Sequence, residues 1–133
     1  MKQFTIKTHS KVAMIDITDR IRNYLGEHPV KSGICHVFIP HTTAGVTINE
    51  NADPDVVKDI ITTLDKLIPL NDRYRHTEGN AAAHIKSSLT GSSQTVFVEN
   101  GDLILGTWQS IFFCEFDGPR TRKVYVKLIP TAT

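Results

Sequence analysis

Three histidines stand in short polar runs of this chain, and imidazole is the side chain that titrates near neutral pH and most often ligates metals. His41 precedes two threonines, His76 follows an arginine-rich run, and His84 comes four residues after Asn80. If a helix begins at Asn80, Asn80 and His84 share one face of it, and His76 can approach from the preceding loop. Converging imidazoles can hold a divalent metal with positions open for water or substrate. The three histidines are therefore the expected centre of any chemistry.

The spacing of these histidines matches no sharp zinc signature such as H-E-x-x-H. In the alternative interpretation, one histidine lies at the surface, another is satisfied in the core, and no metal binds. Arg73 and Arg75, beside His76, could clamp a phosphate, or they could be solvated loop residues. Only proximity to the histidines would give these arginines a function.

A further polar run, residues 41–53, joins two expected strands to the start of a helix. It concentrates hydroxyls, an imidazole, carboxylates and free backbone N–H groups at one end of a sheet, where an anion or a metal can be held. Asn49 and Asp53 are candidate site residues in this run. Asp53 is equally well explained as a helix cap, and the threonines as turn residues, so both interpretations stay open.

The carboxylate of Glu115 falls within a strand whose two faces both look buried. An isolated buried charge is costly, so this group is expected to be neutral, paired or bound to a metal. It either serves a site or forms a structural pair with Arg120 or Arg122. Trp108, a little upstream, is expected to pack in the core or at an interface.

Three helices must position these residues. The expected helices run from Thr18 to near Gly26, from Asp53 to Ile68 and from Asn80 to about Leu89. Threonine, aspartate and asparagine are N-cap residue types, and proline directly after Asp53 suits a first helical turn. The second helix is the most strongly marked, because its apolar residues repeat with helical spacing until Pro69 ends the pattern.

Alternating or continuous apolar runs predict the strands. They are Phe4–Lys7, Val12–Ile17, Ile34–Ile39, Val46–Glu50, Thr95–Val98, Asp102–Phe116 with a break near Gly106, and Lys123–Ile129. The first two can form a hairpin, and Asn100-Gly101 is a tight-turn pair. This order of elements predicts one α+β domain over residues 1–133, with mainly antiparallel sheet and about three helices.

The overall composition excludes several classes of protein. With 133 residues and 40% hydrophobic content, the chain can form one proper core. A formal charge of +1 gives no general reason to bind nucleic acid or an anionic membrane. Its apolar runs are too short to span a bilayer, so the cytoplasm is the expected location. Cys35 and Cys114 are expected to be buried thiols without function.

Five groups of motifs, spread over nearly the whole chain, closely resemble the YjbQ-like family. They are His41-Thr42-Thr43-Ala44-Gly45 with Asn49-Glu50-Asn51-Ala52-Asp53, His76 with Gly79-Asn80-Ala81-Ala82-Ala83-His84, Ser87-Ser88-Leu89, Leu105-Gly106-Thr107-Trp108-Gln109, and Glu115-Phe116-Asp117-Gly118-Pro119-Arg120. The resemblance implies a compact α+β fold that assembles as a homotrimer, with a polar site near the subunit interfaces.

The family resemblance also implies an activity, secondary thiamine-phosphate synthesis. In that reaction a thiazole phosphate attacks hydroxymethylpyrimidine diphosphate and pyrophosphate leaves. It requires a divalent metal, Mg²⁺ or Zn²⁺, or a cluster of basic residues to neutralise the departing pyrophosphate, and donors to hold the second phosphate. The implied roles are metal or phosphate binding for His41, His76 and His84, metal or cation stabilisation for Asp53 and Glu115, orientation for Asn49 and Asn80, and pyrophosphate contact for Arg120.

Two other functions remain open from the sequence. A metal-dependent hydrolase would use the same histidines to activate water. A binding module would hold a small anion or a metal without catalysis, and the absence of a sharp catalytic motif leaves this alternative open. The expected partner in all three cases is a phosphorylated small molecule or another small anion.

Overall fold

The computed structural model describes residues 1–132 and shows an α+β fold in which eight strands and three helices alternate in groups. In chain order the elements are β1 (Lys2–Lys7), β2 (Ala13–Asp16), α1 (Thr18–Glu27), β3 (Ser32–Phe38), β4 (Ala44–Glu50), α2 (Pro54–Leu67), α3 (Ala81–Thr90), β5 (Ser93–Glu99), β6 (Asp102–Leu103), β7 (Gln109–Glu115) and β8 (Thr121–Pro130). The predicted α+β class and the three helices are confirmed.

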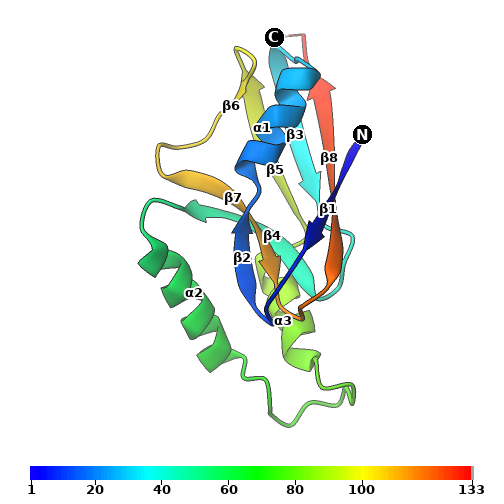
Figure 1. The fold of residues 1–133 in the computed structure, drawn as a ribbon, viewed down its shortest axis with the longest axis vertical. Helices are drawn as coiled ribbons and strands as arrows, with labels where there is room; N and C mark the ends of the chain where they lie inside the picture. The colour runs from blue at the N-terminus through cyan, green and yellow to red at the C-terminus, as the bar shows by residue number, and fades with distance from the viewer. Residues whose placement is uncertain (133) are drawn as a thin grey trace.

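The strands form two antiparallel sheets, as Figure 1 shows. The larger sheet has the order β1-β8-β3-β5-β6, and the smaller one has the order β2-β7-β4. All the strand pairs are antiparallel. Asn100 and Gly101 both have positive φ, 52° and 77°, in the turn between β5 and β6, which confirms the predicted tight turn.

The predicted hairpin between the first two strands is wrong. β1 pairs with β8, whereas β2 pairs with β7 in the other sheet. The connecting segment crosses between the sheets, and it is held there because Thr8 donates its backbone N–H to the Arg120 carbonyl and its hydroxyl to Glu115. Sequence alternation marks each strand correctly but carries no information on its partner.

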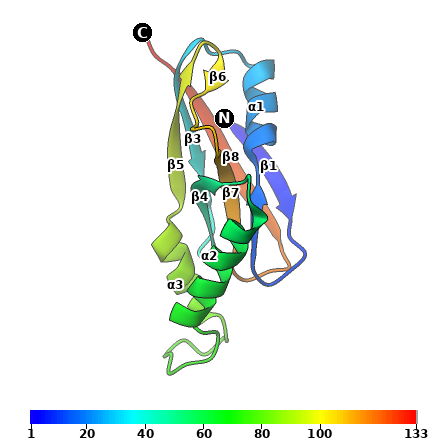
Figure 2. The same ribbon diagram turned by 90° about the vertical axis from the view of Figure 1, so that its left-hand side faces the viewer.

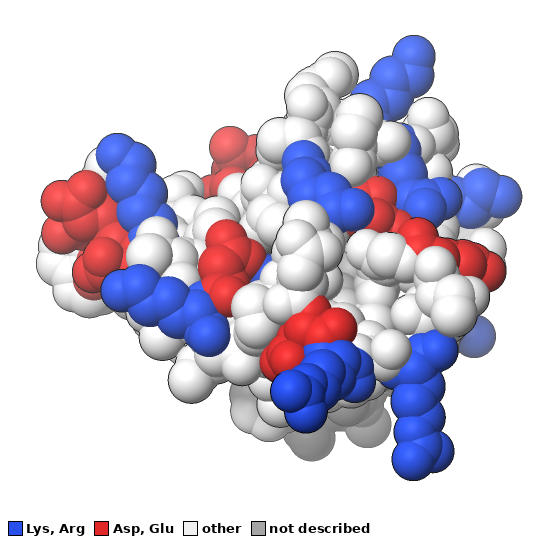
Figure 3. Space-filling view, turned by 90° about the horizontal axis from the view of Figure 1, so that it is seen from below, with Lys and Arg blue, Asp and Glu red and all other residues white. Residues whose placement is uncertain are grey.

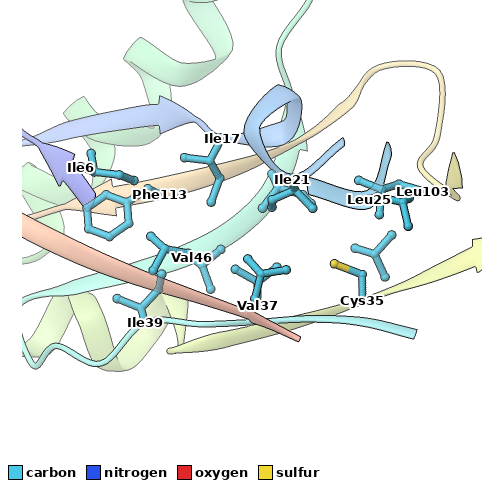
Figure 4. Close-up of a cluster of buried hydrophobic side chains, with 14 of the residues drawn as sticks. Ile6, Ile17, Ile21, Leu25, Cys35, Val37, Ile39, Val46, Leu103 and Phe113 are labelled. Atoms are coloured by element: carbon cyan, nitrogen blue, oxygen red, sulfur yellow. The ribbon is translucent and has the colours of Figure 1, made fainter. Parts of the chain in front are cut away.

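The main core lies between the two sheets and α1 (Figure 4). Ile21 and Leu25 of α1 are 0% and 2% exposed, and they pack over β3 residues such as Val37. Phe113 of β7 fills the layer between the sheets and is fully buried. Burial of these apolar side chains is the dominant force that holds the two sheets together.

α2 and α3 cover the outer face of the smaller sheet. Ala83 of α3 packs with Phe112, Cys114 and Phe116, and Val57 and Leu64 of α2 lie at the edge of this cluster. α2 has no buried residue, and Figures 1 and 2 show it standing along one side of the molecule. The helix itself is confirmed, since Asp53 accepts a hydrogen bond from the Asp55 N–H and Pro54 begins the first turn.

Two other expectations fail locally. Ile17, not Thr18, is the N-cap of α1, because the Thr18 hydroxyl is used to accept a 2.8 Å hydrogen bond from the Ile111 N–H of β7. Trp108 does not pack in the core, as 63% of it is exposed before β7 begins. The interface role predicted for Trp108 stays a prediction.

No helix within residues 1–132 is both long enough and apolar enough to cross a membrane. Figure 3 shows basic and acidic side chains interspersed over the face seen from below. The surface charge on that face is therefore mixed and presents no broad field of one sign.

Candidate functional site

A cleft of about 640 Å³ opens where β3 ends, α3 begins and the β7–β8 connection passes. Its lining residues are Phe38, Ile39, Pro40, His41, Thr42, Thr43, Glu78, Asn80, His84, Ser92, Arg120 and Arg122. Four site residues predicted from the sequence are therefore brought together, namely His41, Asn80, His84 and Arg120. A cavity of this size suits a small-molecule ligand.

The floor of the cleft rests on a buried ion pair between the two sheets. Arg122 of β8 donates from Nε and Nη2 to the two carboxylate oxygens of Glu115 in β7. Glu115 is 0% exposed and also accepts hydrogen bonds from the Thr8 hydroxyl and the Asp117 N–H. Glu115 thus has four donors and does not line the cleft. Of the alternatives that the sequence left open, the structure places Glu115 in a structural pair with Arg122.

The charge state of Glu115 follows from these contacts. Burial alone would raise the pKa of this carboxyl, but the hydrogen bonds from Arg122, Thr8 and the Asp117 N–H hold the pKa below its ordinary value. The pair is therefore ionised at neutral pH, and the Arg122 guanidinium keeps a full positive charge behind the cleft.

One nitrogen of Arg122 remains for a ligand. Nη2 also donates to the Thr43 hydroxyl at 2.9 Å, whereas Nη1 makes no hydrogen bond within the described chain. Within residues 1–132, the buried side-chain atoms without a hydrogen-bond partner do not include Nη1, so this nitrogen is in contact with solvent. Arg122 also lines the cleft. With Nε and Nη2 held by Glu115 and Thr43, Nη1 is the nitrogen of this guanidinium left to donate to a bound anion.

His41 offers a second donor next to the strand that carries Arg122. Its Nε2 accepts a 2.9 Å hydrogen bond from the Lys123 N–H, so a neutral His41 must carry its proton on Nδ1. Burial, followed by the positive charge of Arg122, lowers the pKa of His41 below its ordinary value of 6.5. His41 is therefore a neutral N–H donor at physiological pH.

Asp117 organises the third side of the cleft. It accepts hydrogen bonds from Lys11 at 2.6 Å, Asn80 at 2.9 Å and Arg120 at 2.9 Å. Burial alone would raise its pKa, but these three donors lower the pKa of Asp117 to about 2. Asp117 thereby fixes two residues that line the cleft, Asn80 and Arg120.

In the sequence, Asp117 was named only within the motif from Glu115 to Arg120, and no role was predicted for it. The signal that could have found it is an Asp three residues before an Arg, at the end of a buried strand. The same network accounts for the side chain of Asn80. This side chain makes no capping hydrogen bond to α3, because its amide N–H donates to Asp117 instead. Its other amide atom, Oδ1, is buried and has no partner within residues 1–132.

The histidines converge only in part. The rings of His76 and His84 meet edge to face with centroids 5.2 Å apart, and His84 shares the cleft with His41. No three His, Cys, Asp or Glu side chains among the described residues lie close enough together to hold a metal ion. His41 also fits a metal poorly, because one ring nitrogen is occupied by Lys123 and the other carries the proton. One chain therefore does not form the three-histidine metal site, and metal binding stays a prediction.

Asn49 and Asp53 lie away from the cleft. β4 begins beside the cleft at Ala44 and carries Asn49 near its far end, with Asp53 beyond it. At about 3.3 Å per residue, the strand alone spans about 20 Å. Asp53 caps α2, which agrees with the second of the two interpretations given for it from the sequence, a helix cap. Arg73 and Arg75 do not line the cleft either.

Comparison with known proteins adds the family to this geometry. The sequence profile described as "UPF0047 protein YjbQ-like" matches residues 2–131. The chain belongs to the YjbQ-like UPF0047 family. UPF0047 protein YugU of Bacillus subtilis is 55% identical to it over 130 residues, which are 97% of this chain and 98% of YugU.

Solved structures of the YjbQ-like family agree with the fold. A YjbQ/UPF0047 family protein from Clostridium acetobutylicum has a TM-score of 0.95 at 55% identity, covering 97% of this chain and 100% of that one. A protein from Aeropyrum pernix K1 has a TM-score of 0.93 at 35% identity, with 98% of both chains covered. The α+β fold and the family resemblance seen in the sequence are therefore confirmed.

Proposed function

We propose that the cleft binds the phosphate or diphosphate group of a small molecule. The observation that carries this proposal is that one cavity is lined by two residues that each keep a donor, Arg122 at Nη1 and His41 at Nδ1–H. Arg120 adds a second guanidinium at the mouth, where 52% of its side chain is exposed. Planar guanidinium groups and neutral N–H donors are the groups with which proteins recognise phosphate oxygens.

The arrangement favours an anion over a cation. Glu115 and Asp117, the two carboxylates nearest the cleft floor, are already occupied by donors from the protein. Glu78 lines the rim and is largely exposed, so it adds little negative field inside the cleft. A phosphate would therefore meet donors on two sides.

We further propose diphosphate displacement as the reaction, in the form that the family resemblance implies. Hydroxymethylpyrimidine diphosphate would place its diphosphate against Arg122 and Arg120, which stabilise the charge that develops on the leaving group. Asn80, held in place by Asp117, would orient the substrate from the cleft wall. A thiazole phosphate then attacks the pyrimidine methylene carbon, forming the C–N bond as the C–O bond to pyrophosphate breaks.

We keep a divalent metal in this proposal as an ion that the substrate phosphates bring into the cleft. Mg²⁺ is commonly held by substrate phosphates with few protein ligands, which suits a cleft without three protein ligands in one chain. Zn²⁺ would need a further ligand beside His76 and His84. Zinc analysis of the purified protein, with His84→Asn as the comparison, decides between them.

The binding proposal is tested by calorimetric titration with inorganic pyrophosphate. Arg120→Gln and His41→Gln should each weaken binding about tenfold or more, because each removes one donor to a charged group. Glutamine at position 41 can still accept the Lys123 N–H, so only the Nδ1 donor is lost. Arg22→Gln, which removes an exposed arginine paired with Asp102, is the matched control and should bind as the unmodified protein does. Equal affinities in all four proteins would refute the proposal.

The reaction is tested separately from binding. We expect pyrophosphate release from hydroxymethylpyrimidine diphosphate only when thiazole phosphate is present. Release without the thiazole would identify a hydrolase, the alternative in which water attacks. Binding of pyrophosphate without release in either case would identify a non-catalytic binding module. The cytoplasmic location stays a prediction, which cell fractionation tests.

We propose a homotrimer because the family resemblance implies one, and the uncovered face of the larger sheet offers a surface for association. Ile34 lies opposite Phe97 and Ile129 in the sheet register, and these two are 65% and 44% exposed. Clustered exposed apolar side chains commonly mark association surfaces. Light scattering should give three times the monomer mass, and Phe97→Lys should reduce it; a monomer at all concentrations would contradict the proposal.

A further inference from the structure

We propose that a second cavity, between α2 and α3, binds a small apolar carboxylic acid. This cavity of about 550 Å³ is separate from the phosphate cleft, with which it shares only Asn80. Its walls are mainly apolar, and they are Val12, Ile61, Leu70, Ala82, Ala83 and Phe116, with Ser10, Lys11, Asp65, Asn80 and Lys86 as polar members. The size and lining are typical of a site for an apolar small molecule.

A buried cation sets the polar requirement of this cavity. The side chain of Lys86 in α3 is only 6% exposed, and lysine is rarely buried to this extent unless it is paired. Its Nζ contacts Asp65 of α2 and lies 6.0 Å from the centre of the Phe116 ring. Since Asp65 and Phe116 both line the cavity, the ammonium group lies at the cavity wall.

The ammonium group is incompletely satisfied by the protein. An ammonium carries three N–H donors, and within residues 1–132 Lys86 uses one of them, to Asp65. Asp65 itself is half exposed, so water screens part of its charge. Two donors in a mainly apolar cavity therefore await an acceptor, and a carboxylate supplies two oxygens and the complementary charge. Lys11 also lines the cavity, but its charge is paired with Asp117, so Lys86 supplies the cation for a ligand.

The loose attachment of α2 explains how such a ligand enters. α2 has no buried residue, and Leu67 at its end and Leu70 just beyond it are 71% and 51% exposed. Its apolar face therefore rests only partly on the body of the protein. An acid with a chain of six to eight carbons, roughly the size at which pockets bury most of a ligand, would complete this packing while its carboxylate pairs with Lys86.

The experiment is an NMR titration of the full chain with octanoate. Octanol, which has the same chain length but no charge, is the control ligand. We expect octanoate to shift the amide signals of Ala82, Ala83, Lys86 and Ile61, and to bind about tenfold or more tightly than octanol, because of the charge-assisted hydrogen bonds. Lys86→Met should abolish this preference. Asp65→Asn should tighten octanoate binding, because it removes the carboxylate that competes for Lys86. Lys66→Met, on the exposed side of α2, should change neither result.

Two results would contradict a carboxylate site at Lys86. If Lys86 serves only to fasten α2 to α3, Lys86→Met lowers stability while octanoate and octanol bind alike in the unmodified protein. If a second copy of the chain covers the cavity, octanoate shifts none of these amides. Either result overturns the proposal. Should Lys86→Met fail to fold, the Asp65→Asn result alone decides, since unchanged or weaker octanoate binding contradicts it. Pyrophosphate binding in the other cleft is measured independently, so failure of one site leaves the other intact.

Discussion

The backbone N–H of Lys123 donates a 2.9 Å hydrogen bond to Nε2 of His41. This single contact sets the chemical role of the imidazole. It fixes the proton of the neutral ring on Nδ1, and it withholds Nε2 from any metal. His41 is thereby suited to donate to a phosphate oxygen beside Arg122, and unsuited to act as a metal ligand or a general base.

The first prediction concerns the titration of His41. Its pKa lies below 6.5, because burial and then the charge of Arg122 disfavour the imidazolium. In the unfolded chain the ring binds its proton more readily, so its contribution to stability is complete above pH 6.5 and is lost as pH falls from there toward the folded pKa. Histidine NMR should show His41 still neutral at pH 6.5. A His41 that is half protonated at or above that pH would contradict the assignment.

The second prediction concerns acid stability through Asp117. Its pKa falls from 3.8 to about 2 on folding, so its stabilisation is present above pH 3.8 and is lost as pH falls through about 2. At about 1.4 kcal/mol per pKa unit, this amounts to about 2 kcal/mol. Asp117→Asn should remove this part of the pH dependence between pH 5 and pH 2 in urea denaturation. Asp59→Asn, on the exposed face of α2, is the control, and an equal pH dependence in both variants would refute the prediction.

The third prediction concerns the buried pair of Glu115 and Arg122. Removing one partner leaves an uncompensated buried charge, which costs about 3–5 kcal/mol. Arg122→Met and Glu115→Gln should each lower the free energy of unfolding by this order. The double variant should lose less than the sum, since neither charge is then left alone. Additive losses would show that the two side chains do not stabilise each other.

The fourth prediction compares two glycines. A Cβ at Gly45 would lie 2.4 Å from the Thr90 hydroxyl and 2.6 Å from the Gly91 carbonyl, where α3 meets β4. Gly45→Ala should therefore destabilise the protein by about 1–3 kcal/mol, the usual cost of overpacking. A Cβ at Gly26 meets no atom within 4 Å, so Gly26→Ala in α1 should stabilise by about 0.5–1 kcal/mol. The thermal unfolding midpoints should move in opposite directions, and a shared direction would count against the close packing at Gly45.

The sequence predicts the elements of this fold well because their signals are local. Asp53 and Pro54 mark the start of α2, and Asn100-Gly101 marks a turn, through backbone preferences that neighbouring residues hardly alter. The partners of the strands depend instead on contacts far along the chain. The wrong hairpin of β1 and β2 follows from this, since the crossing is fixed by the bond of Thr8 to Arg120, 112 residues away.

The site was predictable in part for the same reason. His41, Asn80, His84 and Arg120 lie at ends of elements, where polar runs stand out in a sequence. The function of Arg122 depends on a hydrogen bond between the two sheets, and Asp117 is bound by Lys11 and Asn80, which lie far from it along the chain. Asn49 stood out equally clearly in the sequence, but the length of β4 carries it away from the cleft.

Whether His41 and Arg122 together hold a phosphate group is decided by ¹⁵N NMR of the histidine rings with added pyrophosphate. We predict an Nδ1–H tautomer for His41 in the free protein, and a shift of this nitrogen and of the Arg122 guanidinium on addition of pyrophosphate. The ring signals of His36, which is hydrogen-bonded to Thr95 on the larger sheet, should not shift. An Nε2–H tautomer, or a His41 signal that pyrophosphate leaves unchanged, would contradict the account.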